Sequence, residues 1–423
     1  VCVGLRELGL QPTDDQHMLL RVVALLAALS PPCVDAWFGS MTAVDVSPSP
    51  EQIATNAVFL GGYGALGFRD GLTLGFARGV HDPIQARALY LEDDHGQAFV
   101  TLVLDVVGVG NVIRDEIRSA ASLATELPME RILVASTHTH AGPDLQGMWG
   151  GIETSYRSTV VQGAVAAISR AVATKTRVTL SVGSIETGDT LGRNRRGWDY
   201  VLNTTSVLLL RSTETATVVG AFASFPAHTT ILGRSNMQAS GDFAGYVCRA
   251  VEARLQAPAM WINGAVGDVS VVGHGGEGFD RLARYGEVAA EQIVAAILLH
   301  ERPIPSDGRL DFEAVAYTQE ITNLAFVAAL ALGVLDEYYE TVPGSLATIQ
   351  TIAARVRIGE ELEIVTSPGE SLTRNGKEHA TLVALGATIM HSSGFLSTHA
   401  NCLTLCAVLH WYRVIQRNQL LMQ

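Results

Sequence analysis

Apolar stretches alternate with amphipathic stretches along most of the chain. Residues 98–107 (AFVTLVLDVV) and 131–136 (RILVAS) are rich in β-branched and aliphatic side chains, which indicates buried strands. The apolar spacing over 111–124 predicts a helix between them. Further strands are predicted at 206–210, 218–225 and 259–263, and further helices at 158–172, 243–255 and 284–299. This alternation predicts an α/β or mixed α+β fold, with helices covering a central mixed β-sheet.

The alternation of predicted strands and helices continues after a linker-like segment. Residues 302–309 (RPIPSDGR) are rich in proline and polar residues and predict a linker. Beyond it we expect a strand over 310–321, a helix over 324–335 and a strand over 361–367. We therefore expect one domain over residues 37–423, with the linker-like segment inside it.

The first 36 residues are of a different kind. Met18 opens the sequence MLLRVVALLAALSPPCVDA, in which one arginine precedes a short apolar run and a Pro-Pro break. This order is typical of a secretory signal, and the apolar run is shorter than the ~20 residues of a membrane span. We therefore expect residues 1–36 to lie outside the fold and the protein to be secreted or periplasmic. A buried helix near the N-terminus is the alternative interpretation.

Composition and charge narrow the classes of function. The chain of 423 residues is 48% hydrophobic and 17% charged, which excludes an intrinsically disordered chain. Its formal net charge of −13 argues against a sequence-independent grip on nucleic-acid phosphates. The five cysteines are scattered along the chain and indicate neither a disulfide framework nor a zinc ribbon. These features predict a globular protein that does not bind nucleic acid through its phosphates.

A glycine-rich segment has the spacing of a dinucleotide-binding motif but lacks its context. Residues 62–67 (GYGALG) match GxGxxG. In the dinucleotide fold a helix begins directly after the glycines, and its N-terminus binds the pyrophosphate. Here the chain continues as FRDGLTLGFARGVHDP, with three more glycines, a proline and no helical period. We therefore expect a plain turn or a glycine-rich loop near an active site, without a nucleotide.

The first candidate functional residues come directly after the strand predicted at 131–136. The next residues are THTHAGP, in which His138 and His140 stand two positions apart. In extended chain, residues i and i+2 point to the same side, so both imidazoles emerge on one side of a strand end. Two imidazoles at that spacing can supply one metal ligand and one proton-transfer group. A pair of hydrogen-bonded structural histidines is the alternative.

Three further segments carry polar groups near the ends of predicted strands. His228 lies in the segment FPAH, directly after the strand over 218–225. The segment NGAVGDVS presents Ser270, but it lacks the GxSxG elbow of serine hydrolases. Glu370 follows a Ser-Pro-Gly turn after the strand over 361–367. Each of these signals is weak when taken singly.

Together, the four segments resemble the neutral/alkaline (non-lysosomal) ceramidase family. The zinc-dependent catalytic domain of that family carries THTHSGP, PxH, NxGDVSP and PGE stretches in this order. This chain has THTHAGP, FPAH, NGAVGDVS and SPGE in the same order, and the resemblance covers roughly Val44 to Glu370. The family also has an Asn-Arg pair between its histidine segments, matched here by Asn194 and Arg195. The THTHxGP and GDVS pieces are the specific ones.

The resemblance implies a zinc site at the strand ends, with His138, His228 and Glu370 as ligands. Three protein ligands with the fourth position open are typical of a catalytic zinc rather than a structural one. Zinc lowers the pKa of a bound water toward ~7 and polarises the carbonyl that is attacked. These properties suit the hydrolysis of an amide bond.

The resemblance also implies three roles in catalysis. His140 would take a proton from the water and return it to the leaving amine. Arg195 would be a substrate-binding cation, and Ser270 would support the pocket without forming an acyl-enzyme. The implied reaction converts ceramide-like lipids to a sphingoid base and a fatty acid. The implied partner is therefore a small amphiphilic lipid, with at most peripheral membrane contact.

The chain departs from the family pattern in its C-terminal part. Ser270 is followed by valine, where the family usually has proline. Family members add a tyrosine to the zinc environment after the PGE glutamate, whereas residues 382–396 contain none; the candidates are Phe395 at that place and Tyr412 beyond it. Because the sequence ends soon after Tyr412, we expect no immunoglobulin-like C-terminal domain of the kind found in the long ceramidases.

We predict a zinc-dependent amidohydrolase of the ceramidase type and retain two alternatives. One is a serine-dependent esterase or amidase that uses Ser270 with a histidine and Asp268. The other is a catalytically impaired member of the family, which the missing tyrosine favours. Metal content and sensitivity to chelators separate the three.

Overall fold

The computed structural model describes residues 37–197, 203–341, 347–369 and 388–394. All of them belong to one compact unit that begins at Trp37. Residues 1–36 lie outside the described residues, so the signal-like segment that contains Met18 stays a prediction. No helix in the described part of the chain is long and apolar enough to cross a membrane.

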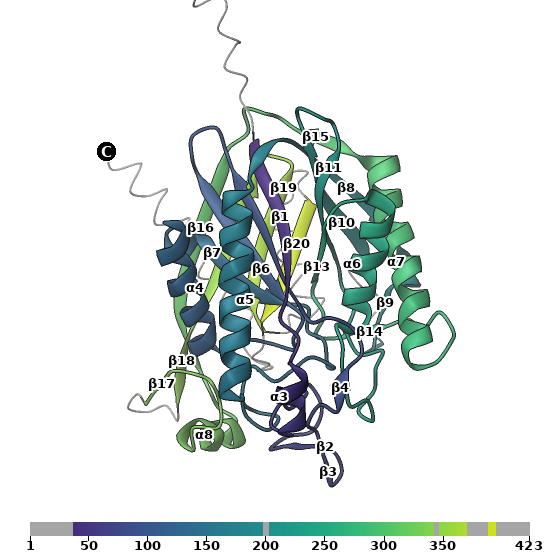
Figure 1. The fold of residues 1–423 in the computed structure, drawn as a ribbon. Coiled ribbons are helices and arrows are strands. Elements are labelled where there is room, and N and C mark those ends of the chain that lie inside the picture. The colour runs from purple at the N-terminus through teal and green to yellow at the C-terminus, as the bar shows by residue number, and fades with distance from the viewer. Residues whose placement is uncertain (1–36, 198–202, 342–346, 370–387, 395–423) are drawn as a thin grey trace, which may run out of the picture. The chain divides into compact units, whose positions relative to one another are not determined.

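A mixed sheet of nine strands forms the centre of the described unit (Figure 1). Its strands in spatial order are β13 (Ala259–Asn263), β11 (Val218–Phe225), β10 (Thr204–Ser212), β8 (Thr176–Glu186), β1 (Trp37–Asp45), β5 (Gln85–Glu92), β6 (Ala98–Leu104) and β7 (Ile132–Ser136), with β15 (Arg302–Ile304) beside β8. Neighbouring strands are antiparallel except for the pairs β11–β13 and β6–β7, which are parallel.

A second sheet packs on one face of the first. Its order is β16 (Leu310–Glu320), β18 (Thr348–Ile358), β19 (Leu362–Pro368) and β20 (Thr388–Gly394), with β17 (Tyr339–Glu340) beside β18. The long β16–β18 pair is antiparallel and runs without a register shift. The last pair, β19–β20, is parallel.

Four long helices cover the other face of the main sheet (Figure 1). They are α4 (Asn111–Thr125), α5 (Thr154–Ala173), α6 (Asp242–Leu255) and α7 (Gly278–His300). Because side chains alternate along a strand, each strand serves both layers. On β5, Ala86 and Ala88 pack with α4 and α5, whereas Leu89 and Leu91 pack toward the second sheet. The layers are therefore helices, main sheet and second sheet, in that order.

Short elements complete the described fold. They are the helices α3 (Pro50–Ala54) and α8 (Leu324–Ala331), the 3₁₀ turns Met129–Arg131 and Gly188–Thr190, and the strand pairs β2 (Phe68–Asp70) with β3 (Thr73–Leu74), β4 (Gly79–Val80) with β12 (Gln238–Ala239) and β9 (Gly192–Asn194) with β14 (Val269–Val271). The last two pairs join segments that are far apart in the sequence. Backbone hydrogen bonds link them to the histidine segments, from Ser240 N to Ala141 O beside β12 and from His228 N to Val269 O on β14.

The predicted fold class is confirmed, with one correction in detail. The strands predicted at 218–225 and 259–263 coincide with β11 and β13, and the helix predicted at 111–124 is α4. Residues 302–304 of the expected linker form β15 instead. Since β1 pairs with only the first residues of β8, the rest of that edge is open, and β15 pairs there. The segment therefore connects layers within one unit.

The contact between α7 and β8 gives a test of the layer arrangement. A methyl group added at Gly183 on β8 would lie 2.4 Å from the backbone oxygen of Ala296 on α7. We expect Gly183→Ala to lower the free energy of unfolding by about 1–3 kcal/mol, because helix and strand must move apart. The matched control is Gly233→Ala, whose added methyl group meets nothing within 4 Å and should change stability by less than about 0.5 kcal/mol. Equal denaturation midpoints for the two variants would contradict this packing.

Candidate metal centre

The segments that follow β7, β11 and β13 meet at one place. In the strand order, β7 and β13 stand at opposite ends of the main sheet, yet β13 also contacts β5 and β6. The sheet is therefore folded toward itself, which brings the two edges together. The backbone N–H of His140 donates to Thr229 O at 3.1 Å, a direct link between the two histidine segments.

Asn263 holds these segments in register. Its side-chain nitrogen donates to Thr137 O at 3.1 Å, and its side-chain oxygen accepts from Ala227 N at 3.3 Å. The hydroxyl of Thr229 donates to the same Thr137 oxygen at 2.7 Å. All these groups are buried, where an unpaired polar atom is costly. The carboxamide thus fixes how the loops after β7 and β11 lie against each other.

Three imidazoles converge where these loops meet. His140 Nε2 lies 3.3 Å from His138 Nε2 and 3.2 Å from His228 Nε2, and all three can present a nitrogen to one ion. Two nitrogens bound to a tetrahedral zinc ion at ~2.0–2.1 Å lie about 3.3–3.4 Å apart. The spacing of the three donors therefore fits a zinc-sized ion.

Backbone carbonyls orient two of the rings. His138 Nδ1 donates to Val107 O at 2.8 Å, and His228 Nδ1 faces Val266 O at 3.5 Å. A carbonyl oxygen can only accept, so the proton of each neutral ring sits on Nδ1 and leaves the Nε2 lone pair for a metal. His138 also has a left-handed backbone, with φ +58°, which is uncommon for a residue with a side chain and is found where surrounding contacts hold it.

The glycine-rich loop packs against His140. The backbone of Gly62 lies so close that an added Cβ would be 2.3 Å from the His140 ring. The ring of Tyr63 meets His140 edge to face, with 4.9 Å between centroids. The GxGxxG segment is therefore a wall of the histidine cluster, and its glycine at 62 is required by contact with the imidazole.

Electrostatics keep the His140 ring neutral. Burial is the main cause that lowers the pKa of His140 well below its usual value, and the positive charge of Arg69 acts in the same direction. A group whose pKa lies well below 6.5 is unprotonated at neutral pH. His140 therefore has a nitrogen lone pair that can accept a proton or bind a metal.

Arg69 is a positioning residue that the sequence analysis missed. It is 3% exposed, and its guanidinium donates to backbone carbonyls of three segments: His140 O at 2.6 Å, Gly61 O at 2.9 Å and Asn236 O at 3.0 Å. Burial lowers the pKa of Arg69 to about 10, so the group remains cationic at neutral pH. Its inward place in the short strand β2 follows from strand alternation, but an arginine in a glycine-rich loop gives no sequence signal of burial.

The other two predicted catalytic residues, Ser270 and Arg195, lie on or directly after the strands of the β9–β14 pair. Ser270 on β14 pairs through its backbone with Arg193, and the neighbouring Val269 O accepts from His228 N at 3.2 Å. Arg195 follows β9 and donates from Nη2 to Gly267 O at 2.7 Å. These contacts attach the segment of Ser270 and Arg195 to the backbone of His228.

The predicted third ligand, Glu370, is not among the described residues. Phe395 and Tyr412, the two candidates for the missing tyrosine, also lie outside them. In the described part of the chain, a second group that could hold an ion is Asp93, Asp94 and His95, in the turn between β5 and β6. Asp93 there caps the turn by accepting from His95 N and Gln97 N, which explains its burial without a metal.

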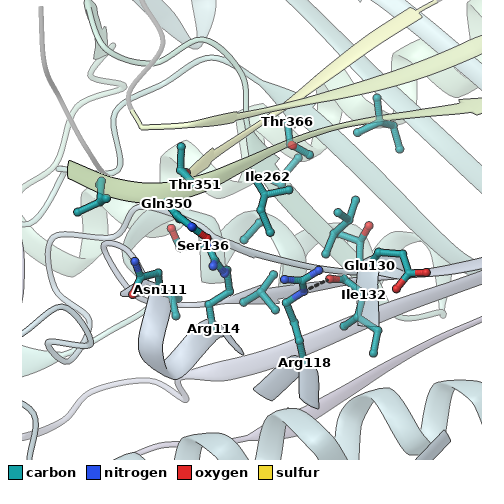
Figure 2. Close-up of a pocket in the computed structure, with 18 of the residues that line it drawn as sticks. Asn111, Arg114, Arg118, Glu130, Ile132, Ser136, Ile262, Gln350, Thr351 and Thr366 are labelled. Atoms are coloured by element: carbon teal, nitrogen blue, oxygen red, sulfur yellow. Dashed lines mark hydrogen bonds between the residues drawn. The ribbon is translucent and has the colours of Figure 1, made fainter. Parts of the chain in front are cut away.

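A cavity of about 110 Å³ lies between the main sheet and the second sheet (Figure 2). Ile132, Ile262 and Thr351 are among the residues that line it, and none of the three clustered histidines is. The cavity borders the histidine cluster through Ser136, whose hydroxyl donates to Val107 O, the carbonyl that also accepts from His138. The cavity is therefore a neighbour of the histidine cluster and separate from it.

Comparisons with known proteins identify the family and the fold of this chain. The family model "Neutral/alkaline non-lysosomal ceramidase, N-terminal" matches residues 66–297, which is 232 of the 423 residues. The solved structure of a neutral ceramidase from Pseudomonas aeruginosa matches with a TM-score of 0.66 and 19% identity, over 86% of this chain and 69% of that one. A structure of a ceramidase complexed with C2 matches with a TM-score of 0.67 and 18% identity, over 85% and 69%.

A search among curated proteins finds no match. The family match covers both histidine segments and the Asn263–Ser270 segment, and the similar structures share the fold of the described unit. The chain therefore belongs to the neutral/alkaline non-lysosomal ceramidase family.

Proposed function

We propose that this protein is a zinc-dependent amidohydrolase that cleaves the N-acyl amide bond of ceramide-like lipids, giving a sphingoid base and a fatty acid. The observation that carries the proposal is the convergence of three imidazole Nε2 atoms at distances that suit one ion. Membership of the ceramidase family supports the reaction class. The proposed substrate rests on membership of the family and not on a contact in this structure.

His138, His228 and Glu370 are the proposed zinc ligands. Two of them have the tautomer that metal binding needs, because their Nδ1 atoms face carbonyl oxygens. Neutral imidazoles and a carboxylate are common zinc donors. When bound, zinc would lower the pKa of a water molecule toward ~7 and polarise the substrate carbonyl. A set of three histidines, with His140 in place of Glu370, is the competing ligand set that the geometry also supports.

His140 is the proposed proton-transfer group. Its neutral ring lies within 3.3 Å of both ligand nitrogens and so borders the proposed zinc site. There it would take a proton from the attacking water and return it to the leaving amine. Gly62 and Tyr63 limit the movement of this ring. Arg195 is the proposed substrate-binding cation, and Ser270 the serine that supports the pocket.

We also propose that the protein is secreted or periplasmic, on the basis of the signal-like segment that opens at Met18. Cell fractionation, together with the N-terminal sequence of the purified protein, tests this directly. A cytosolic protein that retains residues 1–36 would contradict export.

The metal assignment predicts the behaviour of one ligand variant. Purified protein should contain about one zinc per chain, and His228→Ala should lose it with little change in fold, because loss of a ligand weakens metal affinity strongly. Elemental analysis and circular dichroism measure the two properties. Full zinc occupancy in His228→Ala would contradict the assignment. Activity that survives chelation, together with labelling of Ser270 by a fluorophosphonate, would favour the serine-dependent alternative.

The division of roles predicts a different result for His140. His140→Ala should keep its zinc but lose on the order of 10²–10⁴ in turnover of an N-acyl amide, which is the usual contribution of general acid–base catalysis. His138→Ala is the matched variant, two residues away, and should lose the metal. If both variants lose zinc equally, His140 is a ligand and the three-histidine set replaces the one proposed.

A further inference from the structure

The hairpin β2–β3 carries a cluster of exposed apolar side chains. Leu66, Phe68, Leu72 and Leu74 all lie within nine residues of the chain, and Leu72 at the turn is 91% exposed. Single exposed apolar residues are ordinary on a protein surface, whereas a contiguous group of large ones marks a contact site. We call these four residues the apolar hairpin.

Strand geometry explains why the group faces outward. Phe68 pairs with Leu74 across the hairpin, so the two side chains lie on the same face. Arg69, between Phe68 and Asp70, points to the opposite face and is buried. The left-handed Gly71, with φ +58°, makes the turn that presents Leu72. One face of the hairpin is therefore apolar and exposed, while the other is anchored by an arginine.

The anchored face leads directly to the histidine cluster. Arg69 donates to His140 O and Gly61 O, and Gly62 and Tyr63 of the same loop touch the His140 ring. In Figure 1, β2 and β3 lie at the lower end of the view, and β15, which follows α7, lies at the upper end. The apolar hairpin thus adjoins the proposed active site, whereas the exposed Leu298 and Leu299 belong to the last turn of α7, directly before β15.

Charge indicates which kind of surface this hairpin fits. The chain has a formal net charge of −13, which opposes approach to an anionic surface. Of the two charged residues in 66–74, Arg69 is buried and Asp70 lies 3.9 Å from Arg234. Attraction by charge is therefore absent from this hairpin, and burial of apolar side chains is the remaining source of binding free energy.

We propose that the apolar hairpin inserts into the surface of a zwitterionic lipid layer and places the histidine cluster beside the lipid in which the substrate resides. The position of the substrate rests on the proposed function, since a ceramide-like amphiphile is held in lipid aggregates. Insertion itself rests only on the exposed residues of the hairpin. Leu72 enters first, followed by the paired Phe68 and Leu74.

Binding to phosphatidylcholine vesicles tests the inference with the full chain and needs no turnover. Co-sedimentation should detect binding of the wild-type protein that changes little with salt. Leu72→Ser should bind about tenfold more weakly, because one leucine no longer leaves water, and Phe68→Ser/Leu72→Ser about a hundredfold. Leu298→Ser is the matched control, an exposed leucine of the same kind, and should bind as the wild type does. The thermal midpoint of each variant reports that it is folded.

Several outcomes would overturn the inference. They are no binding of the wild type to zwitterionic vesicles, binding only to anionic vesicles with a strong dependence on salt, or equal losses in Leu72→Ser and Leu298→Ser. A wild-type dimer in light scattering that Leu72→Ser dissociates would assign the hairpin to a protein interface instead. Vesicle binding without amide hydrolysis would contradict the proposed function and leave this inference standing.

Discussion

The carboxamide of Asn263 is the contact on which the site depends. It joins the end of β13 to the segments that carry His138 and His228, and every partner is buried. Since a buried amide must satisfy both its nitrogen and its oxygen, the two loops can lie against each other in few ways. The folding of the main sheet toward itself brings these ends close, and Asn263 fixes their register. The convergence of imidazoles follows from that register.

A second constraint is the burial of Arg69 beside this arrangement. A buried cation is costly unless it is hydrogen-bonded, and here backbone carbonyls satisfy it where a carboxylate commonly would. Because those carbonyls belong to the glycine-rich loop, to the His140 segment and to the segment after His228, the cation ties the three together. Its positive charge also helps to keep His140 neutral. Both the arrangement of these three segments and the protonation state of His140 therefore depend on Arg69.

The sequence predicted the parts of the fold that consist of continuous apolar runs. Residues 218–225 and 259–263 are buried strands, and their bounds are recovered to the residue. It did not predict β1 or β8, in which serine, threonine and glycine interrupt the apolar residues and weaken the signal. Nor did it predict that β15 completes an open edge of β8, because pairing between distant segments leaves no local pattern.

The candidate site also contains residues that the sequence predicted and residues that it did not predict. His138, His140 and His228 were found because each stands in a short motif directly after a strand, and the structure brings them together. Arg69 and Asn263 act through their burial and through contacts with backbone atoms. Such roles depend on the tertiary fold, so a list of chemically active residue types does not reveal them. Glu370, Arg195 and Ser270 retain the roles that the family resemblance implies, as proposals.

We propose that one metal ion binds where the loops after β7 and β11 meet. Anomalous diffraction from crystals of the zinc-loaded protein, recorded on both sides of the zinc absorption edge, tests it most directly. We expect one strong peak at ~2.0–2.1 Å from both His138 Nε2 and His228 Nε2, the usual zinc–nitrogen distance. A peak at Asp93, Asp94 and His95 instead, or no peak at the three histidines, would contradict it.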